Sequence, residues 1–138
     1  MKTLYIASAV ATGDGRNGHV RSTDGILDTE VRTPTELGGP GGATNPEQLF
    51  AAGYAACFHS ALKLAAAQAK ADTTDSEVVA DVSLGSNDAG GFGLAVQLEI
   101  TLPALEPQEA LALVEQAHQV CPYSNATRGN IEVTLTVA

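Results

Sequence analysis

The sequence predicts an α+β fold, with about six mainly antiparallel strands packed on two main helices. Three observations carry this prediction. Alternating apolar and polar residues mark segments near both ends, a long alanine-rich segment has helical periodicity, and the elements follow the order strands, helix, strands, helix, strand. The length of 138 residues predicts a single domain over residues 1–138.

The first third of the chain is expected to form an antiparallel meander. Its opening residues imitate a secretory signal, but Lys2 is the only positive charge there and Thr and Ser interrupt the apolar run, which favours a strand. A turn is expected at residues 13–18, which are dense in residue types that tolerate positive φ. The expected strands span residues 3–12, 19–23 and 27–33.

A Gly/Pro-rich loop at residues 34–44 leads into one long helix over residues 45–71. Asn45 can cap the N-terminus, and Pro46 suits the first helical position, where a missing N–H does no harm. Gln48, three residues after Asn45, resembles the second half of a capping box. An apolar stripe is expected at Phe50, Tyr54, Cys57, Ala61 and Leu64.

This helix is apolar over most of its circumference, because alanine and glycine fill the positions between the larger side chains. A helix that is apolar all round is buried all round, and a single sheet covers only one side of it. In a chain this short a second subunit is the simplest cover, so we expect a homodimer.

The second half of the chain is expected to add a strand pair, a second helix and a last strand. A polar turn at residues 86–91 joins the pair, and Pro122 stops the second helix just after Cys121. Residues 123–130 are expected to form a loop. The strands span residues 77–85, 93–102 and 131–137, and the helix spans residues 106–120.

The net charge is −9, from 7 basic and 16 acidic residues. This argues against nucleic acid and anionic membrane surfaces as partners, since both need clustered Lys and Arg. No segment is expected to supply the ~18 to 20 apolar residues of a membrane helix. We therefore expect a cytoplasmic protein with no membrane partner, and a reducing compartment disfavours a structural disulfide.

Cys57 lies in the apolar middle of the long helix, where a plain core cysteine is one interpretation, since free cysteine is among the most buried residue types. Neither Cys57 nor Cys121 belongs to a CxxC pair, which excludes a thioredoxin-type motif and a zinc knuckle. No nucleophile elbow is present. The histidines also lack metal-ligand spacing, so we expect no bound metal or cofactor; they are His19, His59 and His118.

Three segments carry a resemblance to a known family: NPEQLFAAGYAACF around Cys57, GGFGLAV at residues 90–96, and HQVCPYSNATRGNI at residues 118–131. They resemble the organic hydroperoxide resistance proteins, the Ohr branch of the Ohr/OsmC family, and VCPYS around Cys121 favours this branch over the OsmC branch. The resemblance, which runs from about residue 4 to residue 137, implies an intertwined homodimer and a thiol-dependent peroxidase that reduces alkyl or fatty-acid hydroperoxides to alcohols. Lipoyl dithiols, either dihydrolipoamide or a lipoylated protein, would supply the electrons.

Position by position, the resemblance implies that Cys57 is the peroxidatic thiol, oxidised to a sulfenate, and that Cys121 resolves it as a disulfide. Arg16 matches the family's active-site arginine, and Glu47 matches its glutamate partner. The chemistry agrees, because burial raises a thiol pKa and Cys57 lies too far along the helix for the helix dipole to help. A fixed cation is then needed, and a carboxylate can hold it in place.

The arginine's assignment and its reach leave alternatives open. An extra residue, Asp14, precedes the turn, and Arg21 lies close by as an alternative to Arg16. Glu47 and Cys57 lie ten residues apart, or about 15 Å along one straight helix, on different faces. Either the Arg16 side chain bridges part of this gap, or Arg16 and Glu47 serve the thiol of the partner subunit, which we favour.

Apolar side chains are expected to line the substrate pocket and to favour alkyl hydroperoxides over hydrogen peroxide. Ordinary core packing is an equal alternative for each of them. Two other functions are an OsmC-like peroxidase with a different substrate preference and a dimeric module that binds apolar ligands and holds two inert cysteines. The pocket candidates are Phe50, Tyr54, Phe58 and Phe92.

Overall fold

The computed structural model describes residues 1–138 and divides into two compact units, Met1–Leu49 and Phe50–Ala138. We call them the N-terminal and C-terminal units. The α+β class is confirmed, with six strands in two three-stranded sheets and three α-helices. The expectation of one domain over the whole chain stays a prediction.

The N-terminal unit contains the expected antiparallel meander. Its strands are β1 (Ala9–Asp14), β2 (Asn17–Ser22) and β3 (Asp28–Glu30), hydrogen-bonded in that order, and a short 3₁₀ helix follows at Thr35–Leu37. The first strand begins at Ala9 and not at Thr3, so that part of the prediction is wrong for the single chain. Leu4 and Ile6 alternate as in a strand, but they have no strand partner and are 90% and 76% exposed.

The meander buries very little apolar surface of its own. Val31 is its one large buried apolar residue, and every residue of β1 is exposed. Three strands need a covered hydrophobic face to be stable independently. The N-terminal unit therefore depends on packing partners outside its own sheet.

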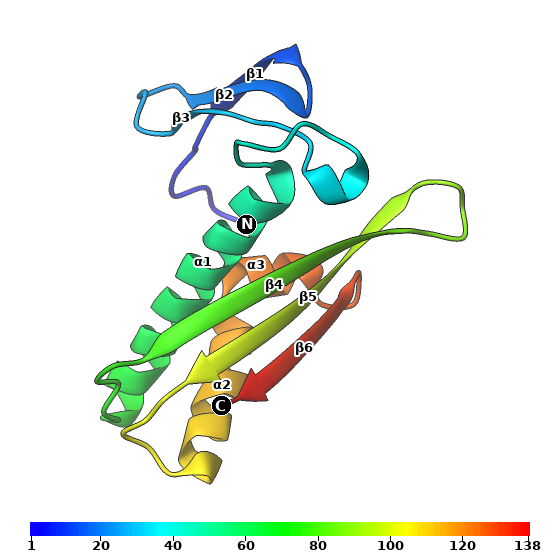
Figure 1. The fold of residues 1–138 in the computed structure, drawn as a ribbon. Helices are drawn as coiled ribbons and strands as arrows, with labels where there is room; N and C mark the ends of the chain where they lie inside the picture. Colours follow the sequence, from blue (N-terminus) through cyan, green and yellow to red (C-terminus); the bar gives the residue numbers. More distant parts are fainter. The chain divides into compact units, whose positions relative to one another are not determined.

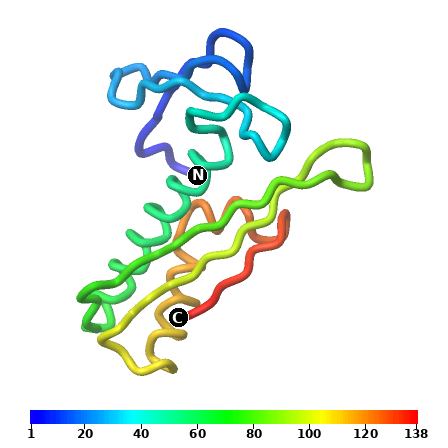
Figure 2. The backbone as a smooth tube through the Cα atoms, in the orientation of Figure 1, coloured from blue at the N-terminus to red at the C-terminus, as the bar shows by residue number.

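The C-terminal unit is built on a mixed sheet in the order β4-β5-β6 (Figure 1). Strands β4 (Glu77–Ser86) and β5 (Phe92–Thr101) form an antiparallel hairpin, and β6 (Glu132–Val137) pairs with β5 in parallel. A parallel pair needs a crossover connection, and here the crossover carries α2 (Pro107–Val120) and α3 (Pro122–Thr127). The long hairpin appears in Figure 2 as two adjacent tubes joined by the turn at residues 87–91.

The helices cover one face of this sheet, as Figure 1 shows. Val96, Leu98 and Ile100 alternate along β5 and are buried, whereas Gln97 and Glu99 between them are exposed. The covering helix α1 (Pro46–Ala69) has all but its first turn in this unit. The other buried apolar residues of the core are contributed mainly by α1 and α2: Tyr54, Phe58, Ala61, Leu62, Ala65, Ala66, Leu102, Ala110, Leu113, Val114, Ala117 and Cys121.

The predicted cap of α1 is confirmed in part. The Asn45 side chain accepts a hydrogen bond from the Gln48 N–H at 2.9 Å, as an N-cap residue does. The reciprocal half of the capping box is absent, because the Gln48 side chain accepts a hydrogen bond from the Thr44 hydroxyl at 2.8 Å. The predicted stripe is also rotated: Phe58 and Leu62 are buried, and Leu64 is 50% exposed.

Helix α3 was not expected, since residues 123–130 were predicted to be a loop. Pro122 does end α2, but it also occupies the first position of the next helix. A proline has no N–H to lose at that position and its φ is already helical. The same residue therefore stops one helix and starts another, with Cys121 between them.

Helix α1 also corrects the expectation about membrane-length segments. By length and composition alone it is long and apolar enough to cross a bilayer. The core helix of a soluble protein meets the same criterion, and α1 packs Tyr54, Phe58 and Leu62 into the core against β5 and α2. These contacts favour a core helix.

Candidate active site

The two cysteines, 64 residues apart in sequence, lie together in the C-terminal unit. The Sγ atoms of Cys57 and Cys121 are 3.5 Å apart, and both thiols are free. Cys57 is partly exposed on α1, and Cys121 is fully buried. An accessible thiol backed by a buried one is the arrangement in which the first can meet an oxidant and the second can form a disulfide with it.

Cys121 is positioned by the junction of α2 and α3. Its N–H donates to the Ala117 carbonyl at 2.8 Å, which closes the last turn of α2. Its own carbonyl accepts the Asn125 N–H at 2.9 Å, which begins α3. Both backbone groups of Cys121 are therefore held, and its side chain points toward α1.

The surroundings of Cys57 disfavour its reactive form. Burial raises the pKa of the Cys57 thiol, and a backbone hydrogen bond from Tyr123 counters part of that rise. No cationic side chain of the C-terminal unit contributes to the shift. Because the thiolate is the nucleophile, an added positive charge would be needed to activate this cysteine near neutral pH.

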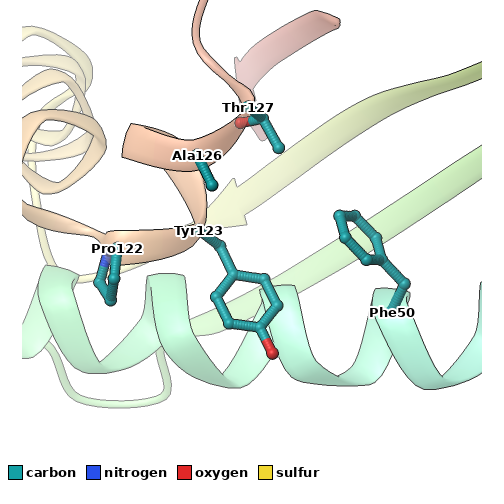
Figure 3. Close-up of a pocket in the computed structure, with 5 residues that line it drawn as sticks. All are labelled: Phe50, Pro122, Tyr123, Ala126 and Thr127. Atoms are coloured by element: carbon teal, nitrogen blue, oxygen red, sulfur yellow. The ribbon is translucent and has the colours of Figure 1, made fainter. Parts of the chain in front are cut away.

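An apolar cavity of about 420 Å³ lies between α1 and α3 (Figure 3). In Figure 3, the Phe50 side chain rises from α1, and the other lining residues come from α3. Tyr123 spans the gap between the two helices, with its ring centroid 5.9 Å from that of Phe50. The cavity is lined by Phe50, Pro122, Tyr123, Ala126 and Thr127.

The four aromatic residues that were predicted to bind substrate lie in different environments. Phe50 lines the cavity. Tyr54 and Phe58 are fully buried in the core, so in this chain core packing describes them. Phe92 starts β5 near the hairpin turn, is 78% exposed and does not line the cavity.

Tyr123 was not predicted as a site residue, although it lines the cavity and its backbone hydrogen-bonds to Cys57. Its position two residues after Cys121, inside the motif around that cysteine, was the available signal.

The glycine at position 53 provides the space in which the Tyr123 ring lies. A Cβ added to Gly53 would lie 2.9 Å from Tyr123 Oη and 3.3 Å from its Cε2. The ring cannot swing away freely, because it is flanked by Phe50 and by Tyr54, whose ring centroid is 5.6 Å away. Gly53 thus fixes how closely α3 approaches α1 beside Cys57.

We therefore expect Gly53→Ala to displace Tyr123. An alanine in a helix interior normally stabilises by about 0.5–1 kcal/mol relative to glycine, but here the contact should cancel that gain and raise the thiol pKa of Cys57. Thermal unfolding and thiol titration measure the two effects. Gly53→Ala combined with Tyr123→Phe removes the nearest atom and should recover stability. Full helix stabilisation with an unchanged titration would contradict the expectation.

Arg16 and Glu47 form a bidentate ion pair in the N-terminal unit. Arg16 donates from Nη1 and Nη2 to the two Glu47 carboxylate oxygens at 2.8 and 2.7 Å. The hydrogen bond to Glu47 raises the pKa of Arg16, and the hydrogen bond from Arg16 lowers the pKa of Glu47. This is the pairing that was predicted, and parallel N–H···O bonds fix the plane of the guanidinium.

The turn that carries Arg16 is set by its neighbours. The two-residue loop Gly15-Arg16 joins β1 to β2, and Gly15 has φ of 59°, as the first central position of a type II′ turn requires. The Asn17 side chain accepts the Thr33 N–H at 3.0 Å and ties the turn to the following loop. Arg21, the alternative to Arg16, lies on β2 with its Nε 3.9 Å from Asp28.

The cysteine pair thus belongs to the C-terminal unit and the Arg16–Glu47 pair to the N-terminal unit. The expectation that Arg16 serves Cys57, in the same subunit or in the partner, stays a prediction. No group of three histidine, cysteine, aspartate or glutamate residues is arranged to hold a metal ion.

His19 lies outside this site, in a charged cluster on the meander. Its Nδ1 lies 3.0 Å from Glu30 Oε1, and its Nε2 contacts Asp28. Hydrogen bonds to Asp28 and Glu30 raise the pKa of His19 above its usual 6.5. The resulting stabilisation is fully present below about pH 6.5 and is lost as the pH rises through the folded-state pKa.

We expect this to make the stability advantage of wild type over His19→Gln depend on pH. The difference in thermal unfolding midpoint should be largest near pH 5.5 and should shrink by pH 8.5. Added salt should reduce it at low pH, since the cluster is exposed. A difference that stays constant with pH would show that the His19 charge does not stabilise the fold.

Comparison with known proteins identifies the family of this chain. A family model described as OsmC-like protein matches residues 39–136. An organic hydroperoxide resistance protein of Xanthomonas axonopodis pv. citri is 58% identical over 139 residues, covering 99% of this chain and 96% of that protein. A crystal structure of such a protein from Legionella pneumophila has a TM-score of 0.95 at 53% identity and covers 99% of each chain.

A second crystal structure, of an organic hydroperoxide resistance protein from Elizabethkingia anophelis, also has a TM-score of 0.95. It is 57% identical and covers 100% of this chain and 99% of its own. The family match covers more than half of the chain, and the curated relative matches it along almost its whole length. The chain therefore belongs to the OsmC-like family, in its organic hydroperoxide resistance (Ohr) branch.

Proposed function

We propose that the protein is a thiol-dependent peroxidase that reduces organic hydroperoxides to alcohols and so defends the cell against oxidative stress. The observation that carries the proposal is the 3.5 Å approach of a partly exposed thiol to a buried one beside an apolar cavity. The relatives named organic hydroperoxide resistance proteins support the substrate class. An apolar cavity suits the organic group of the substrate better than it suits hydrogen peroxide.

The proposed cycle has three steps. The Cys57 thiolate attacks the distal oxygen of the hydroperoxide, the O–O bond breaks, and the alkoxide leaves as alcohol after gaining a proton. The Cys121 thiol then attacks the Cys57 sulfenic acid and releases water, which forms the Cys57–Cys121 disulfide. A dithiol reductant reduces this disulfide by exchange and is itself oxidised to a disulfide.

Arg16 supplies the positive charge in this proposal. A guanidinium near the Cys57 sulfur would lower its raised pKa and stabilise the negative charge that develops in the first step. Glu47 holds the guanidinium through two hydrogen bonds. We favour action of this pair on the thiol of the partner subunit.

A homodimer is part of the proposal, and three features of the single chain support it. The N-terminal meander has almost no core of its own, and Leu4 and Ile6 alternate without a strand partner. Helix α1 exposes Leu64 on the side away from its own core. An intertwined partner would cover all three surfaces at once.

The reductant is inferred from the family, and the compartment from the composition of the chain. We propose dihydrolipoamide or a lipoylated protein as the electron donor, no bound cofactor, and a cytoplasmic location. An OsmC-like peroxidase with another substrate preference and a binding module for apolar ligands are the alternatives. The binding module predicts inert thiols, whereas the short distance between the two sulfurs favours redox chemistry.

The test is consumption of cumene or tert-butyl hydroperoxide with dihydrolipoamide as the reductant. We expect turnover with organic hydroperoxides, slower turnover with hydrogen peroxide, and a Cys57 that reacts rapidly with a thiol probe. A higher rate with hydrogen peroxide would favour the OsmC-like alternative. Absence of turnover together with an unreactive Cys57 would leave the binding module.

A further inference from the structure

A chain of buried hydroxyl groups joins α1 to α3 beside the two cysteines. Tyr54 Oη lies 2.9 Å from Ser124 Oγ and 3.0 Å from Thr127 Oγ1. His118 on α2 extends the chain, with its Nδ1 2.8 Å from Ser124 Oγ. Tyr54 and Ser124 are fully buried and Thr127 is 6% exposed. If one of these hydroxyls is removed, water cannot reach the others to replace the lost hydrogen bond.

The 3.3 Å contact from Thr127 Oγ1 to the Ser124 carbonyl gives this chain one direction. Each hydroxyl has one proton, and with Thr127 donating to this carbonyl, Tyr54 donates to Thr127 and Ser124 donates to Tyr54. His118 then donates from Nδ1–H to Ser124 Oγ. In the opposite direction Nδ1 would accept from Ser124, and the Ser124 carbonyl would keep only the Arg128 N–H at 2.8 Å.

The charge state of His118 agrees with this assignment. Burial lowers the pKa of His118, and the positive charge of Arg128 lowers it further. A lowered pKa favours the neutral ring, whose single proton lies on Nδ1 when His118 donates to Ser124. Every member of the chain donates once, and no buried side-chain polar atom lacks a partner.

The chain is placed where it controls Cys121. Helix α3 has only six residues, begins directly after its N-cap Cys121 and is too short to hold its own position. Two hydroxyl side chains of α3, from Ser124 and Thr127, are bound by one residue of α1, Tyr54, which lies one turn before Cys57 on the same helix. The contact therefore links the helix of one cysteine to the helix that starts at the other.

We propose that the chain formed by Tyr54, Ser124, Thr127 and His118 positions the Cys121 sulfur for attack on oxidised Cys57. The sulfurs must approach by roughly 1.5 Å more to reach a disulfide bond length of about 2.05 Å. The hydrogen bonds between α1 and α3 keep the two sulfurs close together, which raises the effective concentration of Cys121 at Cys57. Its place in a catalytic cycle rests on the proposed function, but its effect on disulfide formation does not.

The first experiment measures the Cys57–Cys121 disulfide at equilibrium in dithiothreitol redox buffers, which needs no peroxidase activity. We expect Tyr54→Phe and Thr127→Val to lower the equilibrium constant for disulfide formation about fivefold to tenfold. Thr127→Ser keeps the hydroxyl and should stay near wild type. Ser76→Ala is the matched control, since it removes a 2.9 Å hydrogen bond between Ser76 and His59 of α1 without touching α3.

The second experiment separates the two chemical steps. After one equivalent of cumene hydroperoxide, Tyr54→Phe should lose the Cys57 thiol as fast as wild type but form the disulfide more slowly. Thr127 also lines the cavity, so the rate of disulfide formation in Thr127→Val is compared with that in Thr127→Ser. Dimedone should therefore trap more sulfenic acid in Tyr54→Phe and Thr127→Val than in wild type. In addition, the ¹⁵N shifts of His118 should report the Nδ1–H tautomer in wild type.

These outcomes distinguish positioning from simple stabilisation. If the variants melt at lower temperature but keep the wild-type disulfide equilibrium, the chain only stabilises the fold and the proposal is wrong. If Tyr54→Phe fails to fold, the disulfide equilibrium of Thr127→Val is compared with that of Thr127→Ser, and equal values would contradict the proposal. If wild type ignores hydroperoxides yet the disulfide equilibrium shifts as expected, the peroxidase function fails and the positioning role stands.

Discussion

Cys57→Ser is expected to abolish hydroperoxide turnover, with a loss on the order of 10³-fold or more, as when the nucleophile of a covalent mechanism is removed. A serine hydroxyl is not ionised at neutral pH, and it cannot form a sulfenate. The measurement is peroxide consumption with dihydrolipoamide in excess. Retention of the wild-type melting temperature, which the similar size of serine favours, shows that the loss is chemical.

Cys121→Ser, unlike Cys57→Ser, is expected to keep the first chemical step and to lose only the disulfide formation that follows. Its Cys57 should react with one equivalent of hydroperoxide at close to the wild-type rate and then stop, because no second thiol forms the disulfide that the dithiol reduces. Mass spectrometry should find the sulfenic acid or its further oxidation products on Cys57. Sustained turnover by Cys121→Ser would contradict the resolving role, and turnover by Cys57→Ser would contradict the whole cycle.

The second large effect is expected from removing the charge of Arg16. In the proposed site Arg16 lies close to the Cys57 sulfur, and a nearby cation lowers the pKa of an acid, so Arg16→Met should raise the pKa of Cys57. Burial already raises that pKa, and the variant would leave this rise uncompensated. The first-step rate at pH 7 should fall at least about tenfold, because less thiolate is present.

The pH profile gives the sign of this effect. The rate of the first step rises with pH as Cys57 loses its proton, so the profile of Arg16→Met should shift to higher pH and recover part of its rate there. Arg21→Met is the matched control and should leave the profile unchanged. Glu47→Gln keeps the arginine but weakens its fixed orientation, and it should cause a smaller loss. A shift in Arg21→Met and not in Arg16→Met would reassign the cation.

Most elements of the fold could be predicted because their sequence patterns are long and consistent. The expected strand 77–85 and the expected helix 106–120 differ by one residue from β4 (Glu77–Ser86) and α2 (Pro107–Val120). The expected strand 3–12 is confirmed only from Ala9 onward. Alternation shows that one side of a segment can be buried, but it does not show that a neighbouring strand is present to pair with. Helix α3 was not predicted, because a proline is typical both of the residues that follow a helix and of the first position within a helix.

The candidate site could be predicted at the level of residues but not of geometry. The cysteines were found through their motifs, and nothing in a spacing of 64 residues indicates that their sulfurs lie 3.5 Å apart. For Tyr54, substrate contact and core packing were equal expectations, because an aromatic residue on an apolar stripe has the same pattern whether it faces a cavity or the core. Its full burial and its hydroxyl partners on α3 favour the core.

The wide separation of the two cysteines along the chain also links redox state to chain entropy. A disulfide across 64 residues would tie the unfolded polypeptide into a large ring, and in the chain-entropy view this disfavours unfolding by roughly 4 kcal/mol. The oxidised form in the proposed cycle would then resist unfolding better than the reduced form. After it has reacted with hydroperoxide, the protein would therefore remain in its more stable, oxidised form until the reductant reduces the disulfide.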